Sequence, residues 1–214
     1  MKKLIIFCLI LNSISAYSQL SSKKVTIHTV DGRIIIGKEL NLNLQKEAND
    51  VKYISKKDGK IKVISLDSIS FIETKKKKII VARDIEFDNT TNDYQKISSL
   101  GEKSHTKFFF LAKYDLFLEV LVEGKINLYR SFLDGISKYF FNPEGVVTPL
   151  LYKVYFLPRP IGYLGHDWAR SNKFYLQQLR NTMPLFDIKG NLEKPKYEHF
   201  HLISYFKKYN GFKK

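Results

Sequence analysis

Short segments in which apolar and polar residues alternate fill residues 24–83, and this pattern constrains the fold more than any other feature of the chain. Residues 24–30 alternate, Asp31 and Gly32 supply a two-residue turn, and residues 33–37 return. Alternation on both sides of Asp-Gly is typical of a β-hairpin with one buried face. The other strands expected in this region lie at residues 51–55, 60–64, 69–72 and 79–82. Strands so short and so closely spaced predict a small curled sheet or an SH3-like barrel.

A second β-rich region follows residues 84–107, a polar segment that lacks sustained periodicity and is expected to connect two sheets. The apolar and aromatic segments of this region lie at residues 108–111, 116–122, 126–129, 138–141 and 150–156. Turns separate them, so they predict an antiparallel meander whose aromatic side chains pack across neighbouring strands.

Helical spacing replaces the strand pattern after Pro158 and Pro160. Ser171 is a suitable N-cap for a helix over residues 172–182, and a second helix is expected over residues 196–209. The apolar stripe expected on the second helix consists of Tyr197, Phe200, Ile203, Phe206 and Tyr209. The expected fold class is therefore α+β and β-dominated: an N-terminal small curled sheet or SH3-like barrel, then an antiparallel meander packed by two C-terminal helices.

The first 18 residues have the organisation of a cleavable secretory signal peptide. Two lysines precede eight apolar residues, 4–11, and a polar stretch with small residues follows. Eight apolar residues are too few to cross a bilayer, which takes about 20, so we expect cleavage after Ala16 or Ser18 rather than an uncleaved anchor. The only cysteine is Cys8, so the exported chain relies on its core and not on disulfides. The predicted division is 1–18 signal peptide, 19–83 small β domain, 84–107 connecting segment and 108–214 α+β domain.

The sequence carries 36 basic and 21 acidic residues, a formal net charge of +15, and loss of Lys2 and Lys3 with the signal peptide leaves +13. Most of the basic residues are lysines, which are hydrated point charges. The excess therefore favours a solvated surface or diffuse attraction to polyanions over a specific phosphate site. The densest basic run consists of Lys75, Lys76, Lys77 and Lys78. It is either a hairpin tip or charged strand edge, or a patch for anionic lipid headgroups or glycan.

The loop around residues 162–168 carries the candidate ligand-binding residues His166, Asp167 and Trp168. Loops between a strand and a helix often hold sites, although a packed loop that caps the core is the alternative interpretation. The sequence has no G-x-S-x-G, P-loop, dinucleotide-binding, H-E-x-x-H or EF-hand motif. His199 and His201 would lie about 200° apart on a helix and so could not share a metal ion. We therefore assign no catalytic residue, metal site or cofactor from the sequence.

Four short segments recur in a familiar order, at residues 117–129, 151–153, 172–179 and 205–210. Taken together they resemble an uncharacterised family of exported Bacteroidetes proteins, over about residues 20–210. In that family the module often precedes an outer-membrane β-barrel, and no barrel is expected after Tyr209 and Asn210 in this chain. The resemblance implies a location in a Gram-negative envelope, and it implies no reaction.

These observations predict an exported envelope protein that acts as a non-enzymatic binding or assembly module. Two alternatives stay open: a binder of anionic envelope lipid or polysaccharide through the basic surface, and a hydrolase that uses the 162–168 loop. The expected partners are an envelope protein or an anionic lipid or glycan. Export argues against nucleic acid as a partner, and no transmembrane segment is expected after signal cleavage. Periplasmic, outer-membrane-associated and secreted locations all fit, and the oligomeric state is left open.

Overall fold

The computed structural model describes residues 24–39, 50–88, 90, 106–133, 136–157, 168–184 and 194–211. The chain divides into two compact units, of which the first holds the described residues 24–39 and 50–76 and the second holds those from 77 onward. The change of unit thus falls between Lys76 and Lys77, whereas the sequence placed the end of the small β domain at residue 83. The expected signal peptide lies outside the described residues.

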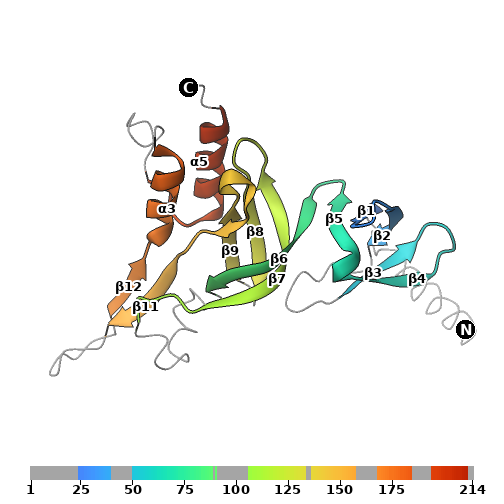
Figure 1. Ribbon diagram of the computed structural model, residues 1–214, viewed down its shortest axis with the longest axis horizontal. Coiled ribbons are helices and arrows are strands. Elements are labelled where there is room, and N and C mark those ends of the chain that lie inside the picture. Colours follow the sequence, from blue (N-terminus) through green and yellow to red (C-terminus); the bar gives the residue numbers. More distant parts are fainter. Residues whose placement is uncertain are drawn as a thin grey trace, which may run out of the picture. The chain divides into compact units, whose positions relative to one another are not determined.

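The first unit is an antiparallel sheet with the strand order β5-β1-β2-β3-β4 (Figure 1). Its strands are β1 (Lys24–Thr29), β2 (Ile34–Glu39), β3 (Asp50–Ser55), β4 (Ile61–Ser65) and β5 (Ile69–Thr74), with a short 3-10 helix, η1 (Leu66–Ser68). Gly32 and Gly59 turn the two hairpins at φ values of 83° and 67°, which glycine adopts without strain. Within the described ranges no pairing joins β4 to β5, so this sheet is open rather than a closed barrel.

One face of the first unit's sheet forms its core. Val25 and Ile27 of β1, Val51 and Tyr53 of β3, and Ile72 of β5 are all buried. Successive side chains of a strand point to opposite faces, so the residues between these core positions lie on the outer face.

The second unit contains the strand order β10-β9-β8-β7-β6 and a separate β11–β12 pair. Its strands are β6 (Lys78–Asp88), β7 (Leu111–Val122), β8 (Leu128–Leu133), β9 (Ile136–Phe141), β10 (Thr148–Pro149), β11 (Lys153–Leu157) and β12 (Trp168–Asn172). Its helices are the short 3-10 helix η3 (Pro143–Gly145) and the α-helices α3 (Phe174–Thr182) and α5 (His199–Gly211). All strand pairs in this unit are antiparallel, as expected for a meander.

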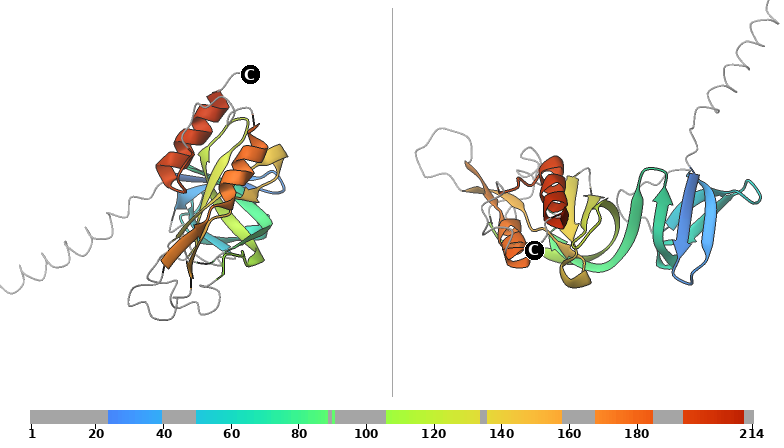
Figure 2. Two further views of the ribbon diagram at one scale, coloured as in Figure 1. Left: turned by 90° about the vertical axis from the view of Figure 1, so that its left-hand side faces the viewer. Right: turned by 90° about the horizontal axis from the view of Figure 1, so that it is seen from above.

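Helices α3 and α5 cover one face of the second unit's sheet (Figure 2). Leu179 of α3 and Phe206 of α5 share a buried cluster with Tyr139 and Phe141 of β9. Phe140 lies between Tyr139 and Phe141 in β9. It belongs to a different cluster, because successive side chains of a strand point to opposite faces of the sheet. The α+β, β-dominated class predicted from the sequence is therefore confirmed, with its meander packed by two C-terminal helices.

The expected helix start at Ser171 is wrong. Ser171 pairs with Val154 in the β11–β12 ladder, and α3 begins only at Phe174, after Lys173. Residues 168–172 pair with β11 over their whole length, so Ser171 extends as part of a strand instead of capping a helix.

The expected stripe of the last helix is borne out at Ile203, Phe206 and Tyr209, which lie in or against the buried cluster, and is wrong at Phe200. Helix α5 begins at His199, so Tyr197 precedes it, and Phe200 is 81 % exposed. The buried residues of α5 are Leu202, Tyr205 and Phe206, because the sheet contact fixes the rotation of the helix. No helix in the described part of the chain is long and apolar enough to cross a membrane.

Strand β6 extends into the segment expected to be a connection. It runs to Asp88 and pairs residue by residue with β7, with Asp88 opposite Leu111. A register shift after Ala82, where Asp84 has a φ of 53°, breaks the alternation that would have marked this part as a strand.

Candidate functional site

The structure describes little of the ligand site that the sequence proposed. His166 and Asp167 lie outside the described residues, and of Trp168 only the main chain is described, paired with Leu157 at the start of β12. His199 and His201 both lie on α5, as expected. Within the described ranges, no group of three or more His, Cys, Asp or Glu side chains is arranged to hold a metal ion.

The lysine run does not act as one uniform patch of unpaired cations. Lys75 and Lys76 are exposed in the turn that follows β5. Lys77 lies 3.0 Å from a carboxylate oxygen of Glu119, and Lys78 lies 2.9 Å from one of Glu123. The position of the run at a turn fits the hairpin-tip interpretation, while its last two members are engaged by carboxylates.

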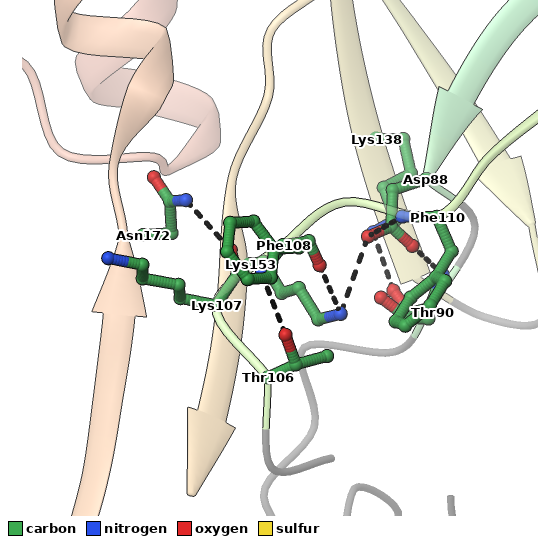
Figure 3. Close-up of polar contacts among 9 residues, drawn as sticks. All are labelled: Asp88, Thr90, Thr106, Lys107, Phe108, Phe110, Lys138, Lys153 and Asn172. Carbon is green, nitrogen blue, oxygen red and sulfur yellow. Dashed lines mark hydrogen bonds and ion pairs between the residues drawn. The ribbon is translucent and has the colours of Figure 1, made fainter. Parts of the chain in front are cut away.

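Asp88, Lys138 and Lys153 form a buried group that we call the lysine cluster (Figure 3). Asp88 ends β6, Lys138 lies in β9 and Lys153 begins β11, so three separate strands bring the charges together. Their exposed fractions are only 4 %, 4 % and 1 %. Ionised groups are tolerated at such depth only where they find partners, because desolvation of a charge is costly.

Asp88 and Lys153 fasten main-chain groups of residues 106–110. Asp88 accepts a hydrogen bond from the Phe110 amide at 3.2 Å through Oδ2 and one from the Thr90 amide at 2.9 Å through Oδ1. The Lys153 ammonium lies 3.7 Å from Oδ2, donates to the Phe108 carbonyl at 2.7 Å, and sits 4.4 Å from the centroid of the Phe110 ring. The carboxylate and this ammonium thus hold the chain that enters β7 against β11.

Lys138 is the less well compensated of the two lysines. Its ammonium donates to the Thr90 carbonyl at 2.6 Å. Burial lowers the pKa of Lys138 to about 8; the Asp88 carboxylate opposes this shift and the Lys153 ammonium adds to it. The Thr90 hydroxyl beside it is buried and has no hydrogen-bond partner among the described residues. Two cations around one carboxylate leave the interior of this unit with an excess positive charge while both lysines are protonated.

A small pocket adjoins the lysine cluster, lined in part by Lys138, Asp88 and three tyrosines. Tyr152 and Tyr197 stack with ring centroids 4.6 Å apart, and Tyr139 meets Tyr197 edge-on at 5.1 Å. The enclosed space amounts to about 10 Å³, far below the volume of typical ligand pockets. It offers room for about one water molecule.

A second charged group joins the sheet to α5. Arg130 donates to Glu119 at 2.6 Å, and its other terminal nitrogen lies 3.2 Å from Nδ1 of His199. Burial opposes ionisation of Glu119, but hydrogen bonds from Arg130 and Lys77 outweigh it, so the pKa of Glu119 is lowered. Burial and the Arg130 charge lower the pKa of His199, which keeps the ring neutral as an acceptor for Arg130.

The outer face of the first unit's sheet carries a set of aliphatic and aromatic side chains that we call the outer apolar face. Its members are Ile34, Ile36, Ile54, Ile61, Val63 and Phe71. Ile34, Ile36, Ile61 and Val63 are 61 %, 40 %, 65 % and 56 % exposed. They share a face because Ile34 lies opposite His28, which lies opposite Phe71, and Ile61 lies opposite Ile54. The rings of His28 and Phe71 stack at 3.9 Å.

Strand β4 ends the strand order of the first unit among the described residues. Proteins usually guard such edges with charged side chains, especially lysine, with proline, or with very short or bulged strands. β10, which ends the order in the second unit, has two residues, one of them Pro149. β4 has five residues and no proline, and Lys62 lies between the exposed Ile61 and Val63 as its one charged residue.

No protein-family model, curated protein or solved structure matches this chain. Its own geometry therefore carries the interpretation.

The two candidate regions differ in what they can do. The donors and acceptors of the lysine cluster bind main-chain groups of the same chain, as expected of a group that stabilises the fold. The outer apolar face leaves apolar surface in water on a sheet whose opposite face already forms a core. The sequence contained a signal for this face that went unused: Ile34, Ile35 and Ile36 are consecutive, so both faces of β2 are apolar.

Proposed function

We propose that this chain is an exported binding module that docks onto a partner protein through the outer apolar face of its first unit. The observation that carries the proposal is the exposure of Ile34, Ile36, Ile61 and Val63 on one face of a sheet. Grouped apolar side chains in water are a common mark of protein–protein contact sites. Export is proposed from the signal peptide, and a Gram-negative envelope from the family resemblance.

The gain on docking is of the right size for a specific contact. Complete burial of one valine or isoleucine side chain contributes about 1.5–3 kcal/mol, and each of these four residues is already partly covered. Together they supply several kcal/mol before the costs of association, which is enough for the apolar centre of an interface but needs polar contacts around it.

Photo-crosslinking in the native cells tests the proposal. A photoreactive amino acid at Ile36 or Val63 should give a discrete adduct with an envelope protein, while one at Lys57, which is exposed in the turn between β3 and β4 and is not part of this face, should not. Ile34→Lys should abolish the adduct at Ile36 and leave the circular dichroism spectrum unchanged, because Ile34 is already mostly in water. Absence of any adduct at both positions would overturn the proposal.

A second candidate function is binding of anionic envelope lipid or polysaccharide. The exposed Lys75 and Lys76 and the formal charge of the chain support it. Such binding must weaken steeply as salt rises from tens to hundreds of millimolar, because exposed charges are screened. Cosedimentation with vesicles that contain an anionic phospholipid, with Lys75→Ser and Lys76→Ser as variants, distinguishes it from docking through the outer apolar face.

A further inference from the structure

We infer that the partner contributes an extended segment, with alternating apolar and acidic residues, that adds to the edge of β4 as an extra strand. The inference rests on the proposed function, because it names the chemistry of the partner for the same unit. It is carried by the main-chain geometry of β4, by the alternation of its side chains and by the charge of the hairpin to which it belongs.

Among the described residues, no strand pairs with the outer edge of β4, toward which the main-chain groups of Ile61 and Val63 point. The Ser55 amide donates to the Lys60 carbonyl at 2.9 Å, so Ser55 and Lys60 form a hydrogen-bonded pair of the β3–β4 ladder. Hydrogen-bonded and non-hydrogen-bonded pairs alternate in antiparallel strands. The amide and carbonyl groups of Lys62 therefore point toward β3, and those of Ile61 and Val63 point away from it, toward an incoming strand.

The side chains around this edge alternate in the same rhythm. Lys60 and Lys62 point to one face, and Ile61 and Val63 to the other. A strand paired with β4 places its own side chains directly opposite these, and opposite charges or apolar pairs across strands each contribute about 0.2–1 kcal/mol. The complement of a lysine–apolar alternation is an acidic–apolar alternation. Lys62 now pairs with Asp58 at 3.0 Å on the surface, a contact weak enough to be exchanged.

The charge of the β3–β4 hairpin excludes a second copy of the chain as the occupant. Residues 50–65 contain five lysines and two aspartates, all of them exposed, which gives a net charge of +3. Two β4 edges paired with each other would bring two such hairpins, each of net charge +3, side by side. Like charges opposite one another destabilise strand pairs, whereas an acidic segment gains from the same field.

Val63→Pro in the mature chain tests the main-chain part of the inference. Proline removes the amide that points to the incoming strand and leaves the bonds of the β3–β4 ladder in place. The matched control Val63→Thr keeps both the amide and the branched side chain. The probe is a soluble peptide in which valine and glutamate alternate, and a peptide with lysine in place of glutamate is its counterpart.

The acidic peptide should bind at least ten-fold more tightly than the basic one at low salt. It should also slow amide hydrogen exchange at Ile61 and Val63. Val63→Pro should weaken it at least ten-fold, and Val63→Thr much less. Because proline could unfold the hairpin, the double variant Lys60→Glu and Lys62→Glu serves as an independent test: it should reverse the preference toward the basic peptide. Equal binding of both peptides, or binding that neither substitution alters, would overturn the inference.

Crosslinking separates this inference from the function on which it rests. If Ile36 crosslinks to the partner and neither Val63→Pro nor the charge reversal changes that adduct, docking occurs without strand addition; the inference fails and the proposed function stands. If no adduct forms in cells while the peptide results are as expected, β4 accepts acidic strands and the proposed function fails.

Discussion

At the scale of single residues, the lysine cluster shows how incompletely this chain compensates the lost hydration of a buried ammonium group. Lys138 and Lys153 share one carboxylate, that of Asp88, and each uses a main-chain carbonyl as its closest partner. A carbonyl offers only a partial charge, so it replaces the hydration of an ammonium incompletely. Lys138 is therefore protonated at neutral pH although burial disfavours its charged form.

Lys138 should make the stability of the second unit depend on pH in the alkaline range. Its pKa is about 8 when folded and 10.5 as the ordinary value, so between these limits the unfolded chain binds a proton that the folded chain has released. Stability from this group therefore rises with pH from about 8 to 10, at up to roughly 1.4 kcal/mol per unit. The free energy of unfolding of wild type should therefore rise with pH relative to that of Lys138→Met across this window.

Urea denaturation followed by Trp168 fluorescence measures this difference, because Trp168 is the only tryptophan and belongs to the second unit. Subtraction of the Lys138→Met curve removes the titration of all other lysines. A difference that stays flat from pH 8 to 10 would contradict the lowered pKa.

Replacement of Asp88 should cost far more than replacement of an exposed aspartate on the same strand. Asp88→Asn leaves two buried ammonium groups without a carboxylate, and loss of one partner from a buried ion pair costs about 3–5 kcal/mol. Asp84 is exposed, and asparagine tolerates its positive φ, so Asp84→Asn should stay within about 0.5 kcal/mol. Urea midpoints at pH 7 compare the two variants, and similar losses would show that the cluster is not held by Asp88.

At the scale of elements, the last turn of α5 is held to the loop after β7 by two hydrogen bonds. The Asn210 side chain accepts from the Ile126 amide at 3.1 Å and donates to the Ile126 carbonyl at 3.0 Å. A Cβ on Gly124 would collide with the Asn210 side chain, so this loop needs glycine for close approach and not for its backbone angle. The helix is thus fixed both by its apolar residues and by a two-point hydrogen bond near its C-terminus.

Asn210→Ala should detach this last turn without unfolding the unit. Two hydrogen bonds are lost and the main-chain groups of Ile126 are left to water, for a cost of about 1–2 kcal/mol. Faster amide hydrogen exchange at Ile126 and in the last turn of α5, with Leu202 unchanged, is the expected result. The exposed Lys207→Ala, one turn earlier, is the control and should alter neither.

Elements defined by local pattern could be predicted from the sequence, and elements defined by distant partners could not. The hairpins around Gly32 and Gly59 form as expected, because alternation and a glycine turn lie within a few residues. Ser171 shows the limit: its capping signal is local, but β11 recruits it into a ladder. Phe200 is another case: it has the spacing of the expected stripe of α5, but the sheet beneath the helix leaves it exposed.

The candidate regions were predictable to different degrees. Lys138 and Lys153 look like two more surface lysines in a lysine-rich chain, and Asp88 lay in the expected connection. Only the pairing of β6 with β7 and the closure of β11 on residues 106–110 place them together. The outer apolar face was accessible in principle, since apolar residues on both faces of β2 and β4 mark strands that have more apolar surface than one core can use.

At the scale of the whole molecule, the chain combines a small sheet that exposes apolar surface with a larger unit that closes on itself. The second unit directs Lys138 and Lys153 inward to its own main-chain carbonyls and covers one sheet face with α3 and α5. The first unit leaves the outer apolar face exposed and carries more basic than acidic residues. A division of this kind suits a module in which one unit binds a partner and the other supplies stability. Such a module must be in the same compartment as its partner.

Export is therefore the prediction on which the choice of partner depends. The apolar run 4–11 should deliver the chain to the translocation machinery, and cleavage should leave Tyr17 or Gln19 as the first residue. Leu9→Arg places a charge in the middle of that run, where it opposes insertion into the membrane, so the chain should accumulate in the cytosol with residues 1–18 attached. Asn12→Gln, just outside the run, should be exported and cleaved like wild type. Mass spectrometry of the N-terminal peptides in cytosolic and envelope fractions distinguishes these outcomes. A wild-type protein that keeps Met1 in the cytosol would move the search for the acidic partner of β4 to that compartment and bring nucleic acid back among the polyanions that a chain of net charge +15 attracts.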